Sequence, residues 1–117
     1  MGLRKNKRYK AKDDVWVRLE RSFQKNQIDD ISLKGLSFYY VDNGHGIGKG
    51  SRYLKLQIGE RSMVEPIRFE VASDTNIGET MLPKNKIRRL SLHFQRLSFR
   101  QKRQLKHLIK HHSINTN

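Results

Sequence analysis

The feature that most constrains this chain is a series of short segments in which apolar and polar residues alternate. In the first, Val15, Val17 and Leu19 are separated by Trp16 and Arg18. A period of two places alternate side chains on opposite faces of a β-strand. Six segments are predicted to be strands: 15–20, 28–33, 36–41, 54–58, 67–71 and 90–94. Short strands joined by turns predict a mainly β fold, here a six-stranded antiparallel barrel.

The end of the chain follows a different pattern. Ser98 and Gln101 stand three residues apart, which is the spacing of a capping box at the start of a helix. Three apolar residues then recur at helical spacing: Leu105, Leu108 and Ile109. We therefore expect an amphipathic C-terminal α-helix at about 98–112 that packs its narrow apolar stripe on the barrel.

Length and composition are those of one small domain. The chain has 117 residues, of which 35% are hydrophobic, so it can build a single modest core. No apolar run approaches the roughly 18 residues of a membrane span, and no apolar stretch follows the basic start as it would in a secretory signal. The chain has no cysteine, which excludes disulfides and thiolate metal sites. A cytoplasmic protein without a cofactor is expected.

Positive charge is concentrated at the two ends. The net charge is +14; residues 1–12 hold six basic residues, 80–117 hold ten, and neither segment contains an acid. All eleven acidic residues lie in 13–79. This distribution indicates an anionic partner such as a nucleotide, a nucleic acid, an acidic protein or an anionic lipid. We expect a basic arm at 1–12 and a barrel with its helix at 13–117.

Within the arm, Arg4 and Arg8 form a pair four residues apart, just before the first predicted strand. That spacing puts two side chains on the same side of a strand or a helix. Guanidinium groups suit phosphate oxygens and the O6/N7 edge of guanine, because both offer paired acceptors. The same pattern also describes a solvated basic tail, and Arg96 and Arg100 repeat the spacing elsewhere.

A second motif is D-x-S-x-x-G, formed by Asp30, Ser32 and Gly35 at the junction of two predicted strands. Strand alternation would set Asp30 and Ser32 side by side on the outer wall, where a carboxylate can accept from the N1–H and N2–H₂ donors of guanine. Gly35 would permit a positive-φ turn or let a ligand approach the backbone. The alternative is a hairpin turn with local side-chain hydrogen bonds.

Together the two motifs resemble the PilZ domain family, and the resemblance covers nearly the whole chain. It implies a bacterial second-messenger receptor of the cyclic di-GMP-binding type. Carried over by position, Arg4 and Arg8 would grip the ligand, and Asp30, Ser32 and Gly35 would contact a guanine. We further expect that the basic arm, which has too little apolar surface to fold alone, becomes ordered over the ligand and so signals to a downstream protein partner. Neither a metal nor a catalytic residue is expected, so the protein is predicted not to be an enzyme.

Two other functions remain open. The basic ends suit a nucleic-acid-binding barrel, in which Phe38, Tyr39 and Tyr40 would stack on bases. Consecutive strand residues do not all face one side, however, and this function leaves the D-x-S-x-x-G motif unexplained. The third possibility is an interaction adaptor without a ligand.

A glycine-dense stretch at 44–50 is interpreted as a hairpin loop, because no helical pattern follows it as in a P-loop. His107 and His111, four apart on the predicted helix, are interpreted as a solvated face.

Overall fold

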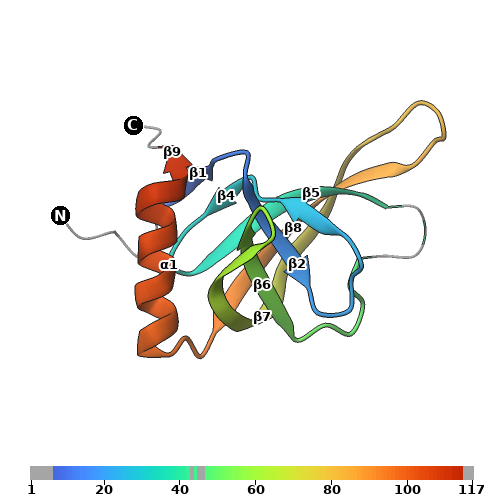
Figure 1. The fold of residues 1–117 in the computed structure, drawn as a ribbon. Helices are drawn as coiled ribbons and strands as arrows, with labels where there is room; N and C mark the ends of the chain where they lie inside the picture. Colours follow the sequence, from blue (N-terminus) through green and yellow to red (C-terminus); the bar gives the residue numbers. More distant parts are fainter. Residues whose placement is uncertain (1–6, 43, 45–46, 115–117) are drawn as a thin grey trace.

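The computed structural model describes residues 7–42, 44 and 47–114. In this part of the chain there are nine strands and one helix (Figure 1): β1 (Tyr9–Ala11), β2 (Val15–Leu19), β3 (Lys25–Gln27), β4 (Asp30–Ile31), β5 (Gly35–Asp42), β6 (Tyr53–Ile58), β7 (Arg61–Glu79), β8 (Lys86–Gln95), α1 (Phe99–His112) and β9 (Ser113–Ile114). The predicted mainly β class with a C-terminal helix is confirmed. The predicted number of six strands is wrong.

The strands form one antiparallel sheet in the order β3-β2-β6-β7-β8-β5-β4-β1-β9. The sheet curls into a partial barrel, and α1 stands at one side of it, against β7, β1 and β9 (Figure 1). The long strands β7 and β8 lie at the centre of the order and continue together as a hairpin that projects beyond the barrel. No helix among the described residues is long and apolar enough to cross a membrane.

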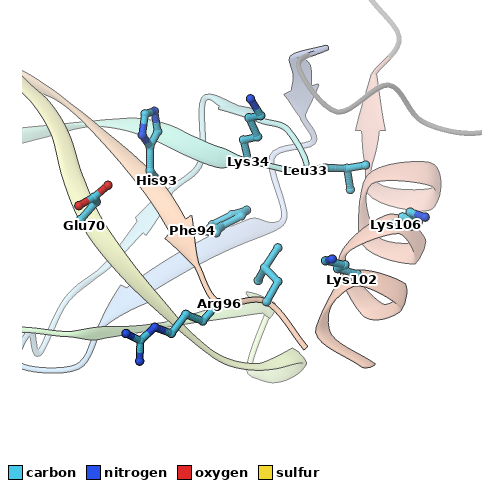
Figure 2. Close-up of a pocket in the computed structure, with 9 residues that line it drawn as sticks. Leu33, Lys34, Glu70, His93, Phe94, Arg96, Lys102 and Lys106 are labelled. Carbon is cyan, nitrogen blue, oxygen red and sulfur yellow. The ribbon is translucent and has the colours of Figure 1, made fainter. Parts of the chain in front are cut away.

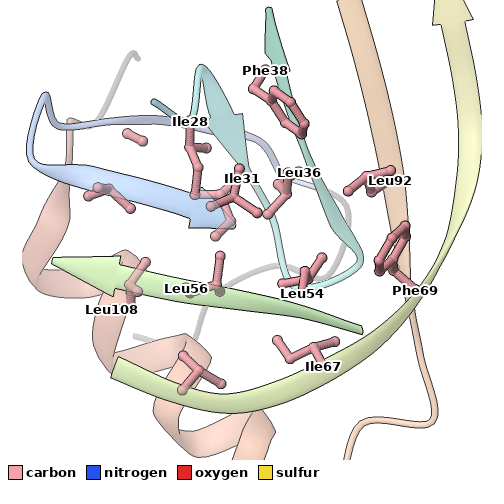
Figure 3. Packing of buried hydrophobic residues seen from close by; sticks show 14 of the residues in the cluster. Ile28, Ile31, Leu36, Phe38, Leu54, Leu56, Ile67, Phe69, Leu92 and Leu108 are labelled. Atoms are coloured by element: carbon pink, nitrogen blue, oxygen red, sulfur yellow. The ribbon is translucent and has the colours of Figure 1, made fainter. Parts of the chain in front are cut away.

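The core is built from alternate residues of the strands, as the sequence pattern predicts. Val15, Val17 and Leu19 are buried, whereas the intervening Trp16 and Arg18 are only partly covered. The buried side chains of β2, β4, β5, β6, β7 and β8 converge inside the curled sheet (Figure 3). Burial of this apolar surface is the main favourable term that holds the sheet closed around its core.

Helix α1 begins as the capping box predicts. Ser98 Oγ accepts a hydrogen bond from the Gln101 backbone N–H at 3.0 Å, and Gln101 Oε1 accepts from the Ser98 N–H at 2.7 Å. The Gln101 amide also donates to the Pro66 carbonyl at 2.8 Å, which ties the start of the helix to β7. The predicted apolar stripe is confirmed, because Leu105, Leu108 and Ile109 are all buried.

The sequence pattern misses the strands that carry little apolar alternation. The segment 28–33 is predicted as one strand, but β4 ends at Ile31 because the chain turns at Ser32. Tyr9–Ala11, inside the segment predicted as an arm, form β1 and pair with β4 and β9. The outer part of the β7–β8 hairpin is mostly exposed and therefore shows no buried face.

Candidate functional site

The carboxylate of Asp30 is the centre of a cluster on the surface of the barrel. Strand pairing sets Asp30 opposite Lys10 of β1 and opposite Ser37 of β5. Its Oδ1 accepts from Arg8 Nη1 at 2.8 Å and from Ser37 Oγ at 2.7 Å, and its Oδ2 accepts from Arg89 Nη2 at 3.0 Å. The structure therefore brings together Arg8 and Asp30, one residue from each of the two predicted motifs.

Arg89 of β8 links the members of this cluster. Its Nη1 donates to Asp29 Oδ2 at 2.8 Å and to the Tyr39 hydroxyl at 2.6 Å, and its Nη2 donates to Ser37 Oγ at 2.6 Å. The guanidinium carbon also lies 5.0 Å from the centre of the Tyr39 ring, within cation–π range. We call Arg8, Lys10, Asp29, Asp30, Ser37, Tyr39 and Arg89 the carboxylate cluster.

Three charged groups of the cluster, Asp29, Lys10 and Arg89, have pKa values that are shifted by their neighbours. Partial burial alone would raise the pKa of Asp29, but hydrogen bonds from Lys10 and Arg89 outweigh it and hold that pKa below its ordinary value. The hydrogen bond to Asp29 raises the pKa of Lys10. Burial lowers the pKa of Arg89, yet the carboxylates and Tyr39 raise it above its usual value overall. At neutral pH these shifts favour the ionised forms of Asp29, Lys10 and Arg89.

Ser32 lies in a different place from the one that strand alternation predicts. It is 2% exposed, and its Oγ accepts from the backbone N–H groups of Lys34 at 3.1 Å and Gly35 at 3.2 Å. The Ser32 N–H in turn donates to the Gly35 carbonyl at 2.8 Å. Ser32 thus shapes the turn between β4 and β5 and does not stand beside Asp30 on the outer wall. Any ligand contact of Ser32 stays a prediction.

Gly35 also serves the structure in a way that the motif does not reveal. Gly35 does not have a positive φ, unlike Gly44, Gly48, Gly50 and Gly59. The turn therefore does not need a left-handed backbone conformation at this residue. Instead, a Cβ at this position would lie 2.0 Å from the Leu92 carbonyl oxygen of β8. Glycine is required because the backbones of β5 and β8 approach each other too closely for a side chain.

Arg4, the first arginine of the predicted pair, lies outside the described residues. The sequence motifs miss Ser37, Tyr39 and Arg89, which complete the cluster around Asp30. Ser37 is indicated only by strand register, and Arg89 is remote in sequence.

On α1, the rings of His107 and His111 lie 4.4 Å apart, but the described residues contain no group of three side chains suited to a metal.

A small curled antiparallel sheet closed by a C-terminal helix, with an arginine and carboxylate cluster beside its first strand, defines a compact β-domain suited to binding a polar anion. This chain belongs to the PilZ domain family, whose model matches residues 2–111. The resemblance noted from the motifs is therefore confirmed.

Two solved structures share the fold. The uncharacterized Legionella protein Lpg0364 has a TM-score of 0.55 and 21% identity, with 89% of this chain and 90% of that chain covered. The Borreliella burgdorferi PlzA protein, solved in complex with c-di-GMP, has a TM-score of 0.55 and 12% identity, with 90% of this chain and 50% of PlzA covered. The chain thus spans half the length of PlzA. No curated protein matches the chain.

Proposed function

We propose that this protein is a cyclic di-GMP receptor whose ligand binds at the carboxylate cluster. The observation that carries the proposal is the contact between Arg8 and Asp30, which joins the arginine motif to the D-x-S-x-x-G motif at 2.8 Å. Membership of the PilZ domain family and the likeness to PlzA, solved with c-di-GMP, support the choice of ligand. A receptor of this kind binds and releases its ligand without a chemical step.

The cluster offers groups that match both parts of such a ligand. The guanidinium groups of Arg8 and Arg89 suit phosphate oxygens and the O6/N7 edge of guanine. The carboxylate of Asp30 suits the N1–H and N2–H₂ donors of guanine. Both Asp30 oxygens accept from Arg8, Ser37 or Arg89, so binding would exchange these partners for the ligand. Arg4, Ser32 and Gly35 enter the proposal through the family motif.

We also propose that the part of the basic arm (1–12) that precedes β1 becomes ordered over the ligand and presents an altered surface to a downstream protein partner in the cytoplasm. The arm carries six basic residues and no acid, and two ligand phosphates would reduce their mutual repulsion. β1 already anchors the end of the arm beside Asp30 through the Lys10 register pair. Amide exchange in the arm should slow on addition of cyclic di-GMP; unchanged exchange at saturation would contradict this part of the proposal.

The test of the site separates guanidinium geometry from charge. Arg8→Ala should abolish most binding of cyclic di-GMP, and Arg8→Lys should also weaken it, because lysine keeps the charge but lacks the planar fork. Loss of a charge-assisted hydrogen bond costs about 1.5–3 kcal/mol, or roughly ten- to a hundredfold in affinity. Calorimetric titration measures each change directly.

Arg100→Ala is the matched control for these variants. Arg100 belongs to the second arginine pair, lies on α1, and forms an exposed ion pair with Glu65 at 3.1 Å. Its removal lowers the net charge by the same amount as Arg8→Ala and should leave the affinity nearly unchanged. If Arg8→Lys binds normally and Arg100→Ala weakens binding as much as Arg8→Ala, the basic surface acts as an unspecific attractor and binding of nucleic acid becomes the better interpretation.

A further inference from the structure

A cavity of about 630 Å³ lies between α1, the 32–35 turn and the end of β8 (Figure 2). Its volume falls within the roughly 300–1,000 Å³ typical of small-molecule pockets. Its lining includes Lys34, Glu70, Phe94, Arg96, Lys102 and Lys106. None of them belongs to the carboxylate cluster.

Four of these residues are cations: Lys34 from the turn, Arg96 from the segment after β8, and Lys102 and Lys106 from α1. None of the four forms an ion pair with any described residue. In the carboxylate cluster, by contrast, the cations are matched with Asp29 and Asp30. Four unmatched positive charges around one cavity repel one another, and a multiply charged anion would relieve that repulsion.

The cavity is also lined by the ring of Phe94, which is partly buried and packs against the hydrophobic core, and by the exposed carboxylate of Glu70. Phe94 lies in the middle of the group in Figure 2, with Glu70 to one side on β7 and the two helix lysines on the other. Glu70 is exposed, and no described residue donates a hydrogen bond to its carboxylate. A ring suits stacking on a nucleobase, and a free carboxylate accepts from the adjacent N1–H and N2–H₂ donors of guanine. Adenine does not present this pair of donors.

The backbone fixes the walls of the cavity. The Phe94 N–H donates to the Lys34 carbonyl at 2.7 Å, which binds the turn to β8. Arg96 has a φ of 51°, in the left-handed region that non-glycine residues seldom adopt. Such backbone strain persists only where the surrounding structure enforces it, and it concentrates at functional sites. Here it turns the chain between β8 and the capped start of α1, with Arg96 at the edge of the cavity.

We propose that this cavity is a second ligand site that binds a guanine nucleotide. The base stacks against Phe94 with its N1–H and N2–H₂ edge on Glu70, and the phosphates contact the surrounding cations. The ligand is either a linear guanosine phosphate or a second molecule of cyclic di-GMP, since both carry guanine and phosphate. The proposal rests on the cavity alone and does not depend on ligand binding at the carboxylate cluster.

The test is calorimetric titration of the full-length protein with GTP, ATP and cyclic di-GMP. GTP should bind at least roughly tenfold more tightly than ATP, because only guanine satisfies Glu70. Glu70→Gln makes the cavity more positive, so attraction by charge alone predicts tighter binding of both nucleotides. The proposal predicts weaker GTP binding and loss of the preference over ATP. Glu70 is exposed, so the variant should fold, and an unchanged melting temperature verifies this.

A matched pair of double variants locates the phosphates. Lys102→Ala/Lys106→Ala should weaken GTP binding by roughly tenfold or more. Lys55→Ala/Lys86→Ala removes the same charge from exposed lysines on β6 and β8 that do not line the cavity, and it should change the affinity little. Equal losses in the two double variants, or equal binding of GTP and ATP by the unaltered protein, would overturn the proposal.

The cyclic di-GMP titration identifies the source of the ligand. If the unaltered protein binds two equivalents of cyclic di-GMP and Lys102→Ala/Lys106→Ala binds one, the cavity takes a second molecule of the messenger. If both proteins bind one equivalent of cyclic di-GMP, and the unaltered protein still binds GTP in the presence of saturating cyclic di-GMP, the cavity takes a linear nucleotide. Arg8→Ala should remove binding at the carboxylate cluster and leave GTP binding intact, so the two sites fail independently. Displacement of GTP by a single equivalent of cyclic di-GMP would contradict a second site.

Discussion

Replacement of Gly35 by alanine should destabilise the fold strongly, although the change adds one methyl group. The ideal Cβ would lie 2.0 Å from the Leu92 carbonyl oxygen and 3.1 Å from its carbonyl carbon. Both atoms belong to the backbone of β8, so no side-chain rotation relieves the contact. Separation to even 3.0 Å requires β5 and β8 to move apart by about 1 Å at this point, where Leu36 and Leu92 pair and are fully buried.

The expected cost follows from two contributions. Overpacking of a close-packed site costs about 1–3 kcal/mol. A shift of this size also stretches the nearest ladder hydrogen bonds of β5 and β8 beyond bonding distance, and each loss costs about 1 kcal/mol. We therefore expect Gly35→Ala to lower the free energy of unfolding by about 2–5 kcal/mol, a large part of the roughly 5–15 kcal/mol of a typical domain.

Urea unfolding followed by the fluorescence of Trp16, the only tryptophan, measures this change. Gly78→Ala is the control, because no atom lies within 4 Å of a Cβ at Gly78 and its φ is not positive. That variant should stay within about 1 kcal/mol of the unaltered protein, since alanine mainly restricts the unfolded chain there. A loss below 1 kcal/mol for Gly35→Ala would refute the argument from close packing.

Two further predictions concern pH. Burial and the hydrogen bond to Asp74 raise the pKa of Tyr40 to about 12, above its ordinary value of 10.0. The contribution of this hydroxyl to stability is therefore complete below pH 10 and is lost as the pH rises toward 12. The difference in unfolding free energy between the protein and Tyr40→Phe should shrink by about 2–3 kcal/mol over that range, and a constant difference would contradict the burial of the hydroxyl. Lys10 and Arg89 outweigh the effect of burial and lower the pKa of Asp29 from 3.8, so the contribution of this carboxylate to stability is complete above pH 3.8 and is lost as the pH falls through the lowered pKa. In urea unfolding, the protein and Asp29→Asn should therefore reach equal stability only in strong acid. Equal stability already near neutral pH would contradict the pairing.

The sequence predicts the parts of the fold whose residues are buried in a regular pattern. Strand β2 shows the alternation directly, and α1 is marked at its start by Ser98 and Gln101. It does not predict β1, β3, β9 or the outer β7–β8 hairpin. These segments are short or largely exposed, and they are strands because a neighbouring strand supplies hydrogen-bond partners, which is a tertiary effect.

The candidate site is predictable only where it is encoded locally. Asp30, Ser32 and Gly35 stand within six residues, and the motif directs attention to them. Ser32 forms the local turn hydrogen bonds of the alternative interpretation, whereas Gly35 meets Leu92, a contact with a distant strand that the motif does not reveal. Arg89 joins the cluster through the pairing of β5 with β8, which no short motif encodes.

Recognition of cyclic di-GMP by the carboxylate cluster is tested most directly by calorimetric titration of this ligand into the protein and into Asp30→Ala, at the same salt concentration. We predict saturable binding to the unaltered protein and weaker binding to Asp30→Ala, because a guanine loses its carboxylate acceptor. Removal of an acid from a chain of net charge +14 increases its attraction for any anion. Tighter binding by Asp30→Ala, or no saturable heat from the folded unaltered protein, would contradict the claim that this cluster recognises cyclic di-GMP.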